Sequence, residues 1–436
     1  MTGSRRMKLA AIVHPGSYSW VADEAWPAGD VSFEMYRTVA QTLERGCFDI
    51  FFLGDTLSVG RGIDLEAASR TANTVGFEPF SLLSALAIVT SRIGLIGTIS
   101  TSYNHPYHVA RKLASLDFLS GGRAGWNLVT STLASEAANF GLEHSLSATE
   151  RYARAEEFLT ATLALWNSWT DDAFIRDKAS GRYFRPDGLR FTGHRGQHFT
   201  IAGPLNIPRS PQGNPVISQA GTSEAGLELA ARGADVMYAS AASLPVAQAF
   251  YTDVKRRLPR HGRAPEALSI LPGLLAVAGR TRAEAEDKFD RVQRRLDFRS
   301  GRALLGGYFL PGIDLSRFGP DDILPDTPEI RASAASRGFD LAAAGPNPTL
   351  RRLADWASSC YCHLLLVGSP SDIADVMEEW FTGFGADGFN LWSHHLPGTY
   401  VDFVDLVVPE LQRRGLVRRR YEGTTLRDHL GLPRPA

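Results

Sequence analysis

Cysteine is scarce in this chain of 436 residues, which has three, at Cys47, Cys360 and Cys362. An odd and sparse set of cysteines argues against a disulfide framework and fits a reducing cytosol. Cys360, Cys362 and His363 together resemble a fragment of a metal site, but no second pair of ligands follows at a suitable spacing. We therefore expect a cytoplasmic protein without a metal.

Long apolar runs and runs of one charge sign are also missing. No stretch of about 18 apolar residues occurs, which is the length that a transmembrane helix needs, so we expect no membrane span. The formal net charge is -1, and no long basic or acidic run is present, so neither nucleic acid nor an anionic membrane is an expected partner. Hydrophobic residues make up 44% of the chain, which is enough for a large core.

Short apolar segments alternate with segments of helical periodicity along most of the chain. Eight segments are expected to be strands: 8–13, 48–53, 93–99, 124–129, 216–219, 236–239, 268–278 and 388–392. Helices are expected between most of them, over 33–43, 80–89, 149–166, 223–232 and 282–296, with a further one that Pro106 opens. Thr149 is the expected N-cap of the helix over 149–166. This alternation predicts a parallel α/β fold, and eight units favour a TIM (β/α)8 barrel over a doubly wound open sheet.

Two stretches interrupt this rhythm. Residues 171–213 are rich in Gly, Pro, Arg and His, and residues 300–348 are rich in Gly, Pro, Ala and Asp. Both are too long to be ordinary connections. We interpret them as insertions into a single domain that spans residues 1–436, and the second one as a lid over the mouth of the active site.

Polar side chains gather where the predicted strands end, on the face of a TIM barrel that carries the active site. They are Asp55, Thr101, Tyr103, His105, Asn127, Thr130 and Ser131. Any one of them can serve only as a turn former or a helix cap, but successive strand ends of this kind predict a site. His14, His394 and His395 also follow predicted strands and are candidate proton donors or structural side chains.

The segment after the fifth predicted strand fits an anion. It spans residues 219–226 and reads QAGTSEAG. Gly221 lets a ligand approach the backbone, and Thr222 and Ser223 open a helix whose free N–H groups and dipole favour negative charge. No Gly-Lys-Ser/Thr and no Gly-x-Gly-x-x-Gly motif is present at the matching places, so Walker and Rossmann sites are not expected. The segment predicts one phosphate, either of a mononucleotide such as FMN or of a sugar phosphate.

Several longer motifs resemble a known family. Residues 116–131, which read LDFLSGGRAGWNLVTS, resemble the signature of the nitrilotriacetate monooxygenase group of the bacterial luciferase-like flavin monooxygenases. That group also contains dibenzothiophene-sulfone, pristinamycin-precursor and long-chain alkane monooxygenases. The segments 150–158, 219–226, 386–390 and 421–427 are similar to further parts of the family, so the resemblance covers almost the whole chain.

This resemblance implies an FMN-dependent monooxygenase of a two-component system. A separate NAD(P)H:flavin reductase would supply reduced FMN, which would react with O2 to a C4a-peroxyflavin that oxidises a small organic substrate. Relatives are usually homodimers or homotetramers. By similarity, Asp55 and Thr101 lie beside the isoalloxazine ring. Asn127, Thr130 and Ser131 hold the ring or the ribityl chain, and Tyr152, Thr222 and Ser223 bind the phosphate.

The catalytic residues are less well defined by the sequence. His105 and Tyr103 are candidate donors to the oxygen intermediate, and the lid would exclude water together with the aromatic side chains Tyr18, Trp20, Phe77 and Trp392. Thr132 stands where the alkane-oxidising relative has a histidine, which argues against alkane oxidation. Three alternatives remain: a deazaflavin (F420)-dependent oxidoreductase of the same superfamily, a hydrolase on the same barrel, and a non-catalytic flavin-binding protein.

Overall fold

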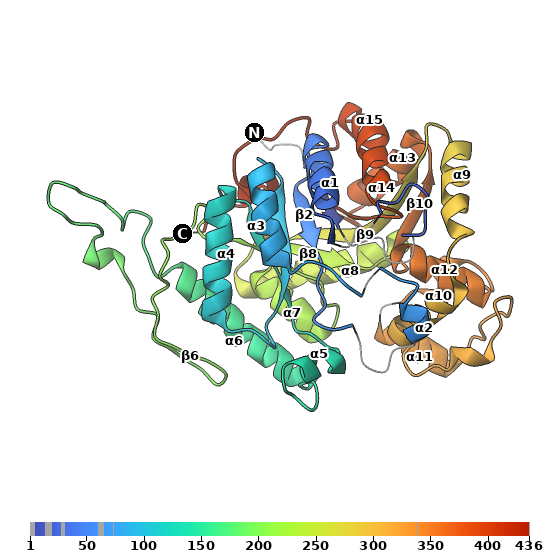
Figure 1. Ribbon diagram of the computed structural model, residues 1–436, viewed down its shortest axis with the longest axis horizontal. Coiled ribbons are helices and arrows are strands. Elements are labelled where there is room, and N and C mark those ends of the chain that lie inside the picture. Colours follow the sequence, from blue (N-terminus) through green and yellow to red (C-terminus); the bar gives the residue numbers. More distant parts are fainter. Residues whose placement is uncertain are drawn as a thin grey trace.

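Eight parallel strands close into a barrel in the computed structural model, which describes residues 5–13, 20–27, 31–59, 65–72, 74–337 and 339–435. The strands are β1 (Lys8–Ile12), β2 (Ile50–Leu53), β3 (Gly94–Ser100), β4 (Ala124–Val129), β7 (Val216–Gln219), β8 (Val236–Ala239), β9 (Ser269–Ala278) and β11 (Gly388–Trp392). Each strand pairs with the next one along the barrel, and the pairing of β11 with β1 closes it. The predicted TIM barrel is therefore confirmed (Figure 1), and the open-sheet alternative is wrong.

The barrel strands are apolar on both faces because both faces are covered. In β1, Leu9 belongs to the cluster that packs under the outer helices, whereas its neighbour Ala10 belongs to the cluster inside the barrel. In β2, Phe51 belongs to the cluster under the outer helices and Ile50 to the cluster inside the barrel. This alternation follows from the two-residue period of a strand, and it explains why the sequence shows continuous apolar runs.

Helices surround the barrel on the outside (Figure 1). The main ones are α1 (Phe33–Arg45), α3 (Pro79–Val89), α4 (Pro106–Ser120), α6 (Ala148–Trp166), α7 (Glu224–Gly233), α8 (Leu244–Arg257), α9 (Arg282–Gln293) and α13 (Pro370–Thr382). Shorter ones are α2 (Leu65–Ala68), α5 (Ala134–Asn139), α14 (Gly398–Asp402), α15 (Val408–Arg413) and α16 (Leu426–Leu430). Within the described residues, none of the helices combines the length and the apolar character needed to cross a bilayer.

The start of α6 corrects one prediction. Ser147, not Thr149, caps this helix: its hydroxyl oxygen accepts from the Glu150 backbone N–H at 3.2 Å, and the Glu150 carboxylate accepts from the Ser147 N–H at 2.9 Å. This reciprocal capping box satisfies two N–H groups at once and places Thr149 inside the first turn.

A further strand, β10 (Leu364–Gly368), was not predicted. It pairs with the second half of β9, from Leu274 to Ala278. Leu274 pairs with Leu364 on one edge and with Leu391 of β11 on the other, so β10 lies on the same edge of β9 as β8. The strand therefore extends the wall of the barrel beyond its carboxyl-terminal rim.

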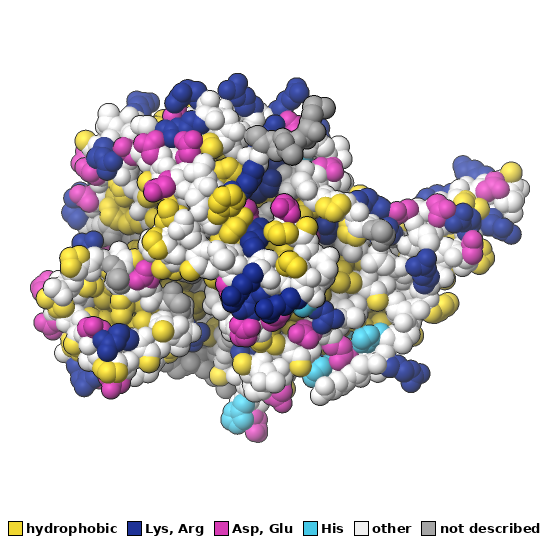
Figure 2. Space-filling model, turned by 180° about the vertical axis from the view of Figure 1, so that it is seen from behind, with side chains coloured by type: hydrophobic (Ala, Val, Ile, Leu, Met, Phe, Trp, Pro, Cys, Tyr) yellow, Lys and Arg dark blue, Asp and Glu magenta, His cyan; other side chains and the backbone are white. Residues whose placement is uncertain are grey.

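Residues 171–213 form an arm that projects from the body of the molecule and contributes no strand to the barrel (Figures 1 and 2). It contains a two-stranded hairpin of β5 (His194–Arg195) and β6 (Thr200–Ile201). The carboxylate of Glu157 in α6 holds the base of this hairpin, because it pairs with His194 at 3.0 Å and accepts from the backbone N–H groups of His198 and Phe199. Figure 2 shows charged side chains of both signs interspersed over the face that it displays.

Residues 300–348 belong to a compact group of helices at one side of the barrel (Figure 1). The group includes α10 (Phe298–Leu304), α11 (Pro328–Ser336) and α12 (Leu350–Cys360). It has its own apolar core, which contains Leu305, Phe309, Leu315, Ile330 and Leu353. The segment is thus a packed insertion, and its movement as a lid stays a prediction.

Candidate active site

Hydrogen bonds connect the carboxyl-terminal ends of β3 and β4. The backbone N–H and the hydroxyl of Thr101 both donate to the carbonyl oxygen of Val129, at 2.9 and 3.1 Å. Ser102 donates to the carbonyl oxygen of Thr130 at 2.6 Å. Two loops therefore lie side by side at the mouth of the barrel: one carries Thr101 and Tyr103, and the other carries Thr130.

Asn127 of β4 belongs to a polar layer across neighbouring strands. Its amide donates to the hydroxyl of Thr98 at 2.9 Å, and its side-chain oxygen accepts from Ser218 at 3.4 Å. Across the barrel, the amide oxygen of Asn390 in β11 is buried without a hydrogen-bond partner among the described residues. Buried polar atoms of this kind need a ligand or water, so they suit a binding site.

Asp55, at the end of β2, lines a cavity of about 170 Å³ together with Ser131, Glu78 and Glu136. Burial, and secondly the nearby Glu78 carboxylate, raise the pKa of Asp55 to about 7. Ser131 adopts a left-handed backbone conformation with φ of 42°, which non-glycine residues enter at some cost. The structure thus brings together two residues of the predicted flavin set, one of which keeps a proton near neutral pH.

Tyr152 and Ser223 come from different elements and meet at the start of α7. The Ser223 hydroxyl donates to the phenol oxygen of Tyr152 at 3.1 Å, and Ser223 caps α7 by accepting from the Gly226 N–H at 3.2 Å. The N–H groups of the first turn that precede Gly226 have no partner within a helix. With the two hydroxyls they are arranged so that they could hold one anion, an arrangement that we call the anion cradle, and Thr222 lies exposed beside it.

Two glycines make room for the phenol in this cradle. A Cβ atom on Gly221 would lie 2.8 Å from the Tyr152 oxygen, and one on Gly226 would lie 2.9 Å from it. Both distances are too short for a side chain. The Gln219 amide nitrogen would lie closer still to a Cβ on Gly221, at 2.4 Å, and the Gly221 carbonyl oxygen would lie 2.8 Å from one on Gly226. The close packing of this loop, with Tyr152 as one part of it, therefore requires both glycines.

The two candidate catalytic residues are engaged in packing. His105 caps α4, since its Nδ1 accepts from the Tyr107 N–H at 3.3 Å, and its ring lies edge-on to Phe199 of the arm. Burial lowers the pKa of His105, so the ring is neutral near pH 7. Tyr103 stacks on Phe140 with ring centres 4.5 Å apart. Their catalytic role stays a prediction.

Of the aromatic side chains expected around a dry cavity, Trp392 is the one at the mouth, where it lies 4.9 Å from the rings of Tyr361 and His363. Trp20 is 51% exposed, and Phe77 packs edge-on against Tyr36. His14 and Tyr18 lie outside the described residues.

His394 and His395 follow β11 as the sequence indicated. Both backbone N–H groups donate to the hydroxyl of Thr399 at 3.0 Å, which fixes the turn. The ring of His394 stacks on Phe289 and receives a hydrogen bond from Gln293. Burial, followed by the neighbouring His395, lowers the pKa of His394 to about 3, so its ring is neutral over the physiological range.

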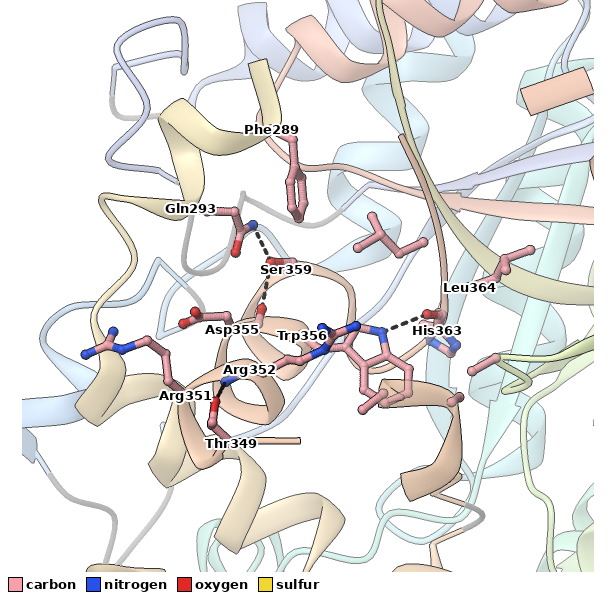
Figure 3. Close-up of a pocket in the computed structure, with 14 residues that line it drawn as sticks. Phe289, Gln293, Thr349, Arg351, Arg352, Asp355, Trp356, Ser359, His363 and Leu364 are labelled. Atoms are coloured by element: carbon pink, nitrogen blue, oxygen red, sulfur yellow. Dashed lines mark hydrogen bonds between the residues drawn. The ribbon is translucent and has the colours of Figure 1, made fainter. Parts of the chain in front are cut away.

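A second, larger cavity, which we call the α9–α12 cavity, was not predicted. It has a volume of about 620 Å³ and is lined by Ala242, Phe289, Gln293, Ala343, Ala344, Thr349, Arg351, Arg352, Asp355, Trp356, Ser359, His363, Leu364 and Leu365 (Figure 3). The lining comes from α9, α12, the start of β10 and adjoining loops, and includes none of the predicted flavin residues. One signal was present, since the apolar run after His363 has the length and composition of a strand.

The cysteines beside this cavity are buried free thiols. Among the residues with a described placement, no three His, Cys, Asp or Glu side chains group in a way that could hold a metal ion.

The chain is similar to proteins of known kind along nearly its whole length. The model of the luciferase-like monooxygenase family matches residues 15–388. Nitrilotriacetate monooxygenase component A from Aminobacter aminovorans is 43% identical over 448 residues, covering 100% of this chain and 98% of that protein. The crystal structure of DmoA from Hyphomicrobium sulfonivorans has a TM-score of 0.89 and 33% identity, with 98% of this chain and 92% of that chain covered.

A solved riboflavin lyase, crystallised with modified FMN and riboflavin, has a TM-score of 0.85 and 28% identity over 98% of this chain and 96% of its own. These matches agree with the resemblance to the nitrilotriacetate monooxygenase group and with the barrel of parallel strands. The chain belongs to the luciferase-like monooxygenase family.

Proposed function

We propose that this protein is the oxygenase component of a two-component monooxygenase, which uses reduced FMN and O2 to oxidise a small organic substrate. The observation that carries the proposal is the anion cradle of Tyr152, Ser223 and the first turn of α7. A relative named as component A of a monooxygenase and a structural neighbour that holds a modified FMN support it. The separate reductase, the homodimeric or homotetrameric state and the cytoplasmic location are further parts of the proposal.

The residues on the barrel mouth fit FMN. The cradle would hold the phosphate, where a hydrogen bond to a charged group contributes about 1.5–3 kcal/mol. Thr222 and Gly221 adjoin it, while Asn127, Thr130, Ser131, Thr101 and Asp55 would face the ribityl chain and the ring. Bound there, reduced FMN would supply the two electrons that activate O2, with one oxygen atom entering the substrate and the other leaving as water. Asp55, which is protonated in part near pH 7, would donate a hydrogen bond to a ring heteroatom.

Removal of the Ser223 hydroxyl tests the proposal. We expect Ser223→Ala to weaken FMN binding by roughly ten- to a hundredfold, because one charge-assisted hydrogen bond is lost. Riboflavin lacks the phosphate, so it should bind the wild type weakly and be nearly indifferent to the substitution. Anaerobic titration with reduced FMN and with reduced riboflavin measures both affinities.

Ser243→Ala is a matched control, since Ser243 stands at the start of the next helix, α8, and makes no capping hydrogen bond with its side chain. It should leave FMN affinity unchanged. An equal loss for FMN and riboflavin in Ser223→Ala would show that Ser223 is a helix cap and not a phosphate ligand. The C4a-peroxyflavin route has its own test, the transient absorbance after the reduced complex is mixed with O2.

A further inference from the structure

The α9–α12 cavity has the size of a small-molecule site, a class that spans roughly 300–1,000 Å³. In Figure 3, Phe289 and Gln293 reach down from α9 toward Ser359 of α12, and Gln293 donates to the Ser359 hydroxyl at 2.7 Å. Trp356 closes another side, where its indole N–H donates to the carbonyl oxygen of His363 at 3.0 Å. The walls are therefore held by hydrogen bonds between the elements.

His363 connects this cavity with the interior of the barrel. Its ring packs directly on the backbone of β9, because a Cβ atom on Gly273 would lie 2.6 Å from the ring. On the other side it lies 4.9 Å from the ring of Trp392, which packs against the cluster inside the barrel that contains Tyr238 and Phe52. The inner end of the cavity thus adjoins the barrel mouth, where the predicted flavin residues gather.

The α12 wall of the cavity is positively charged. Arg351 and Arg352 both line it, and the charge of Arg351 interacts with the carboxyl of Asp355 one turn further along the helix. The guanidinium of Arg351 lies 5.1 Å over the ring of Phe298. Asp355 is the one acidic residue of the lining, and burial raises the pKa of its carboxyl. Burial also lowers the pKa of His363 to about 4, so this histidine adds no charge near neutral pH.

The remaining walls are apolar. Phe289, Trp356, Leu364, Leu365 and Ala344 contribute them. Phe289 is fixed in orientation by its stacking on His394, with ring centres 5.3 Å apart. In Figure 3 the Arg352 side chain extends toward Trp356, whereas that of Arg351 extends the other way from α12. A cavity with flat apolar sides and a guanidinium group beside Trp356 is suited to a ligand with a planar or apolar body and one anionic group.

We propose that the α9–α12 cavity is the substrate pocket of this protein, and that it binds an organic carboxylate whose acid group lies against Arg352, with Arg351 adding positive charge to the α12 wall. The proposal rests on the monooxygenase function proposed above and names the class of its substrate. The apolar body of the substrate extends from the α12 wall toward His363, and so toward the barrel mouth. The barrel strands and α7 then hold the cofactor, while the insertion and its flanks select the substrate.

Binding of two isosteric probes tests this charge preference on the full-length protein. Naphthalene-2-carboxylate and naphthalene-2-carboxamide have nearly the same shape and differ in charge. We expect calorimetry to show the carboxylate binding on the order of tenfold more tightly than the carboxamide. In the double variant Arg351→Ala/Arg352→Ala, this preference should disappear while the carboxamide affinity stays within about twofold, because the carboxamide carries no charge for the guanidinium groups to attract.

Arg331→Ala/Arg337→Ala is the matched control. It removes the same charge from exposed positions of the insertion that precedes α12, and neither residue lines the cavity. Retention of the preference in this control, and its loss in the first double variant, supports the proposal. Equal affinity of the wild type for both probes, binding of neither, or loss of the preference in the control as well would overturn it.

A blocking variant locates the probes. Ala343 lines the cavity from an exposed position, so Ala343→Trp should fill the entrance and abolish binding of both probes without strain on the core. Unchanged probe binding in this variant would place the probes elsewhere and overturn the proposal. FMN affinity, measured on the same samples, keeps the two proposals apart: a wild type that binds the carboxylate but no FMN contradicts the cofactor assignment and leaves the charge preference standing.

Discussion

At the level of single residues, burial decides which side chains at the barrel mouth keep or lose a proton. The pKa of the Asp55 carboxyl is raised to about 7, while the pKa of the His363 ring is lowered to about 4. Both shifts favour the neutral form, because removing a charge from water costs free energy. Neutral hydrogen-bonding groups of this kind would face a ligand bound at the mouth of the barrel, which suits a reaction that must exclude water.

The raised pKa of Asp55 predicts a pH dependence of stability. Between about pH 4 and pH 7 the folded protein holds a proton on Asp55 that the unfolded chain has released, so the free energy of unfolding falls as the pH rises through this window. Above about pH 7 the cost is constant. Asp55→Asn removes it, and we expect this variant to be more stable than the wild type by on the order of 2 kcal/mol at pH 8, with the gain vanishing near pH 4.

Urea unfolding of both proteins at pH 4, 6 and 8 measures this difference. Asp321→Asn, which changes the charge at an exposed position, serves as the control. A gain for Asp55→Asn that is the same at all three pH values would show that the side chain is not protonated by the fold.

The family resemblance assigned Tyr152 and Ser223 to the same phosphate, and the structure brings their hydroxyl groups within 3.1 Å of each other. Their role in binding a phosphate stays a prediction. Arg351, Arg352 and His363 were missed, because they belong to an insertion and its flank, where no regular repeat says which way a side chain points. The Cys360-x-Cys362-His363 motif, which the sequence analysis did not interpret as a metal site, ends at a residue that lines this cavity.

At the level of elements, the helix that carries Tyr152 depends on its cap. Ser147→Ala should lower the free energy of unfolding by about 1 kcal/mol, because the capping box loses the hydrogen bond to the Glu150 N–H. Thr149→Ala removes a hydroxyl two residues further on, inside the first turn, and should have an effect within about 0.5 kcal/mol. Chemical denaturation of the two variants checks the correction directly; equal losses would favour Thr149 as a contributor to the cap.

The predicted strand bounds agree closely with the observed ones for the strands that form the barrel itself. The predicted bounds of β4, β7, β8 and β11 agree with the structure to the residue. The one missed strand of the barrel sheet, β10, pairs on one edge with the part of β9 that extends beyond the rim. It follows a long insertion that interrupts the alternation of strands and helices. The other strands were predicted from this alternation, which was not available for β10.

The insertion over residues 300–348 should exchange its amide hydrogens more slowly when ligands bind. Ala343, Ala344 and Thr349 lie in or beside it and line the α9–α12 cavity, so a bound ligand adds contacts that unite the insertion with α9. Hydrogen exchange with and without reduced FMN and naphthalene-2-carboxylate measures this effect, with the core helix α3 as an internal reference. Exchange over α11 that is slow and identical in both states would contradict the idea of a mobile lid.

At the level of the whole molecule, the proposed function divides the chemistry between the barrel and the helices packed at its side. The barrel strands and the start of α7 would hold the cofactor. Helix α12 with its cap and the preceding insertion, which share an apolar core of their own, supply eight of the fourteen residues that line the larger cavity. Substitutions in the cradle and in the cavity should therefore act independently on cofactor and substrate affinity, as distant sites usually do.

The proposed two-component function predicts how the protein obtains its electrons. If reduced FMN is delivered by a separate reductase, the pure chain should bind FMN more tightly in the reduced than in the oxidised state. It should also leave NADH and NADPH unchanged when FMN and O2 are present.

Addition of an NAD(P)H:flavin reductase should start NAD(P)H consumption at the rate of the reductase alone. Under limiting FMN, Ser223→Ala should lower product formation without changing that rate, because the substitution affects the capture of the reduced flavin and not its supply. Rapid oxidation of NADH by the pure chain would show instead that reduction and oxygenation occur on one polypeptide, and the two-component assignment would be wrong.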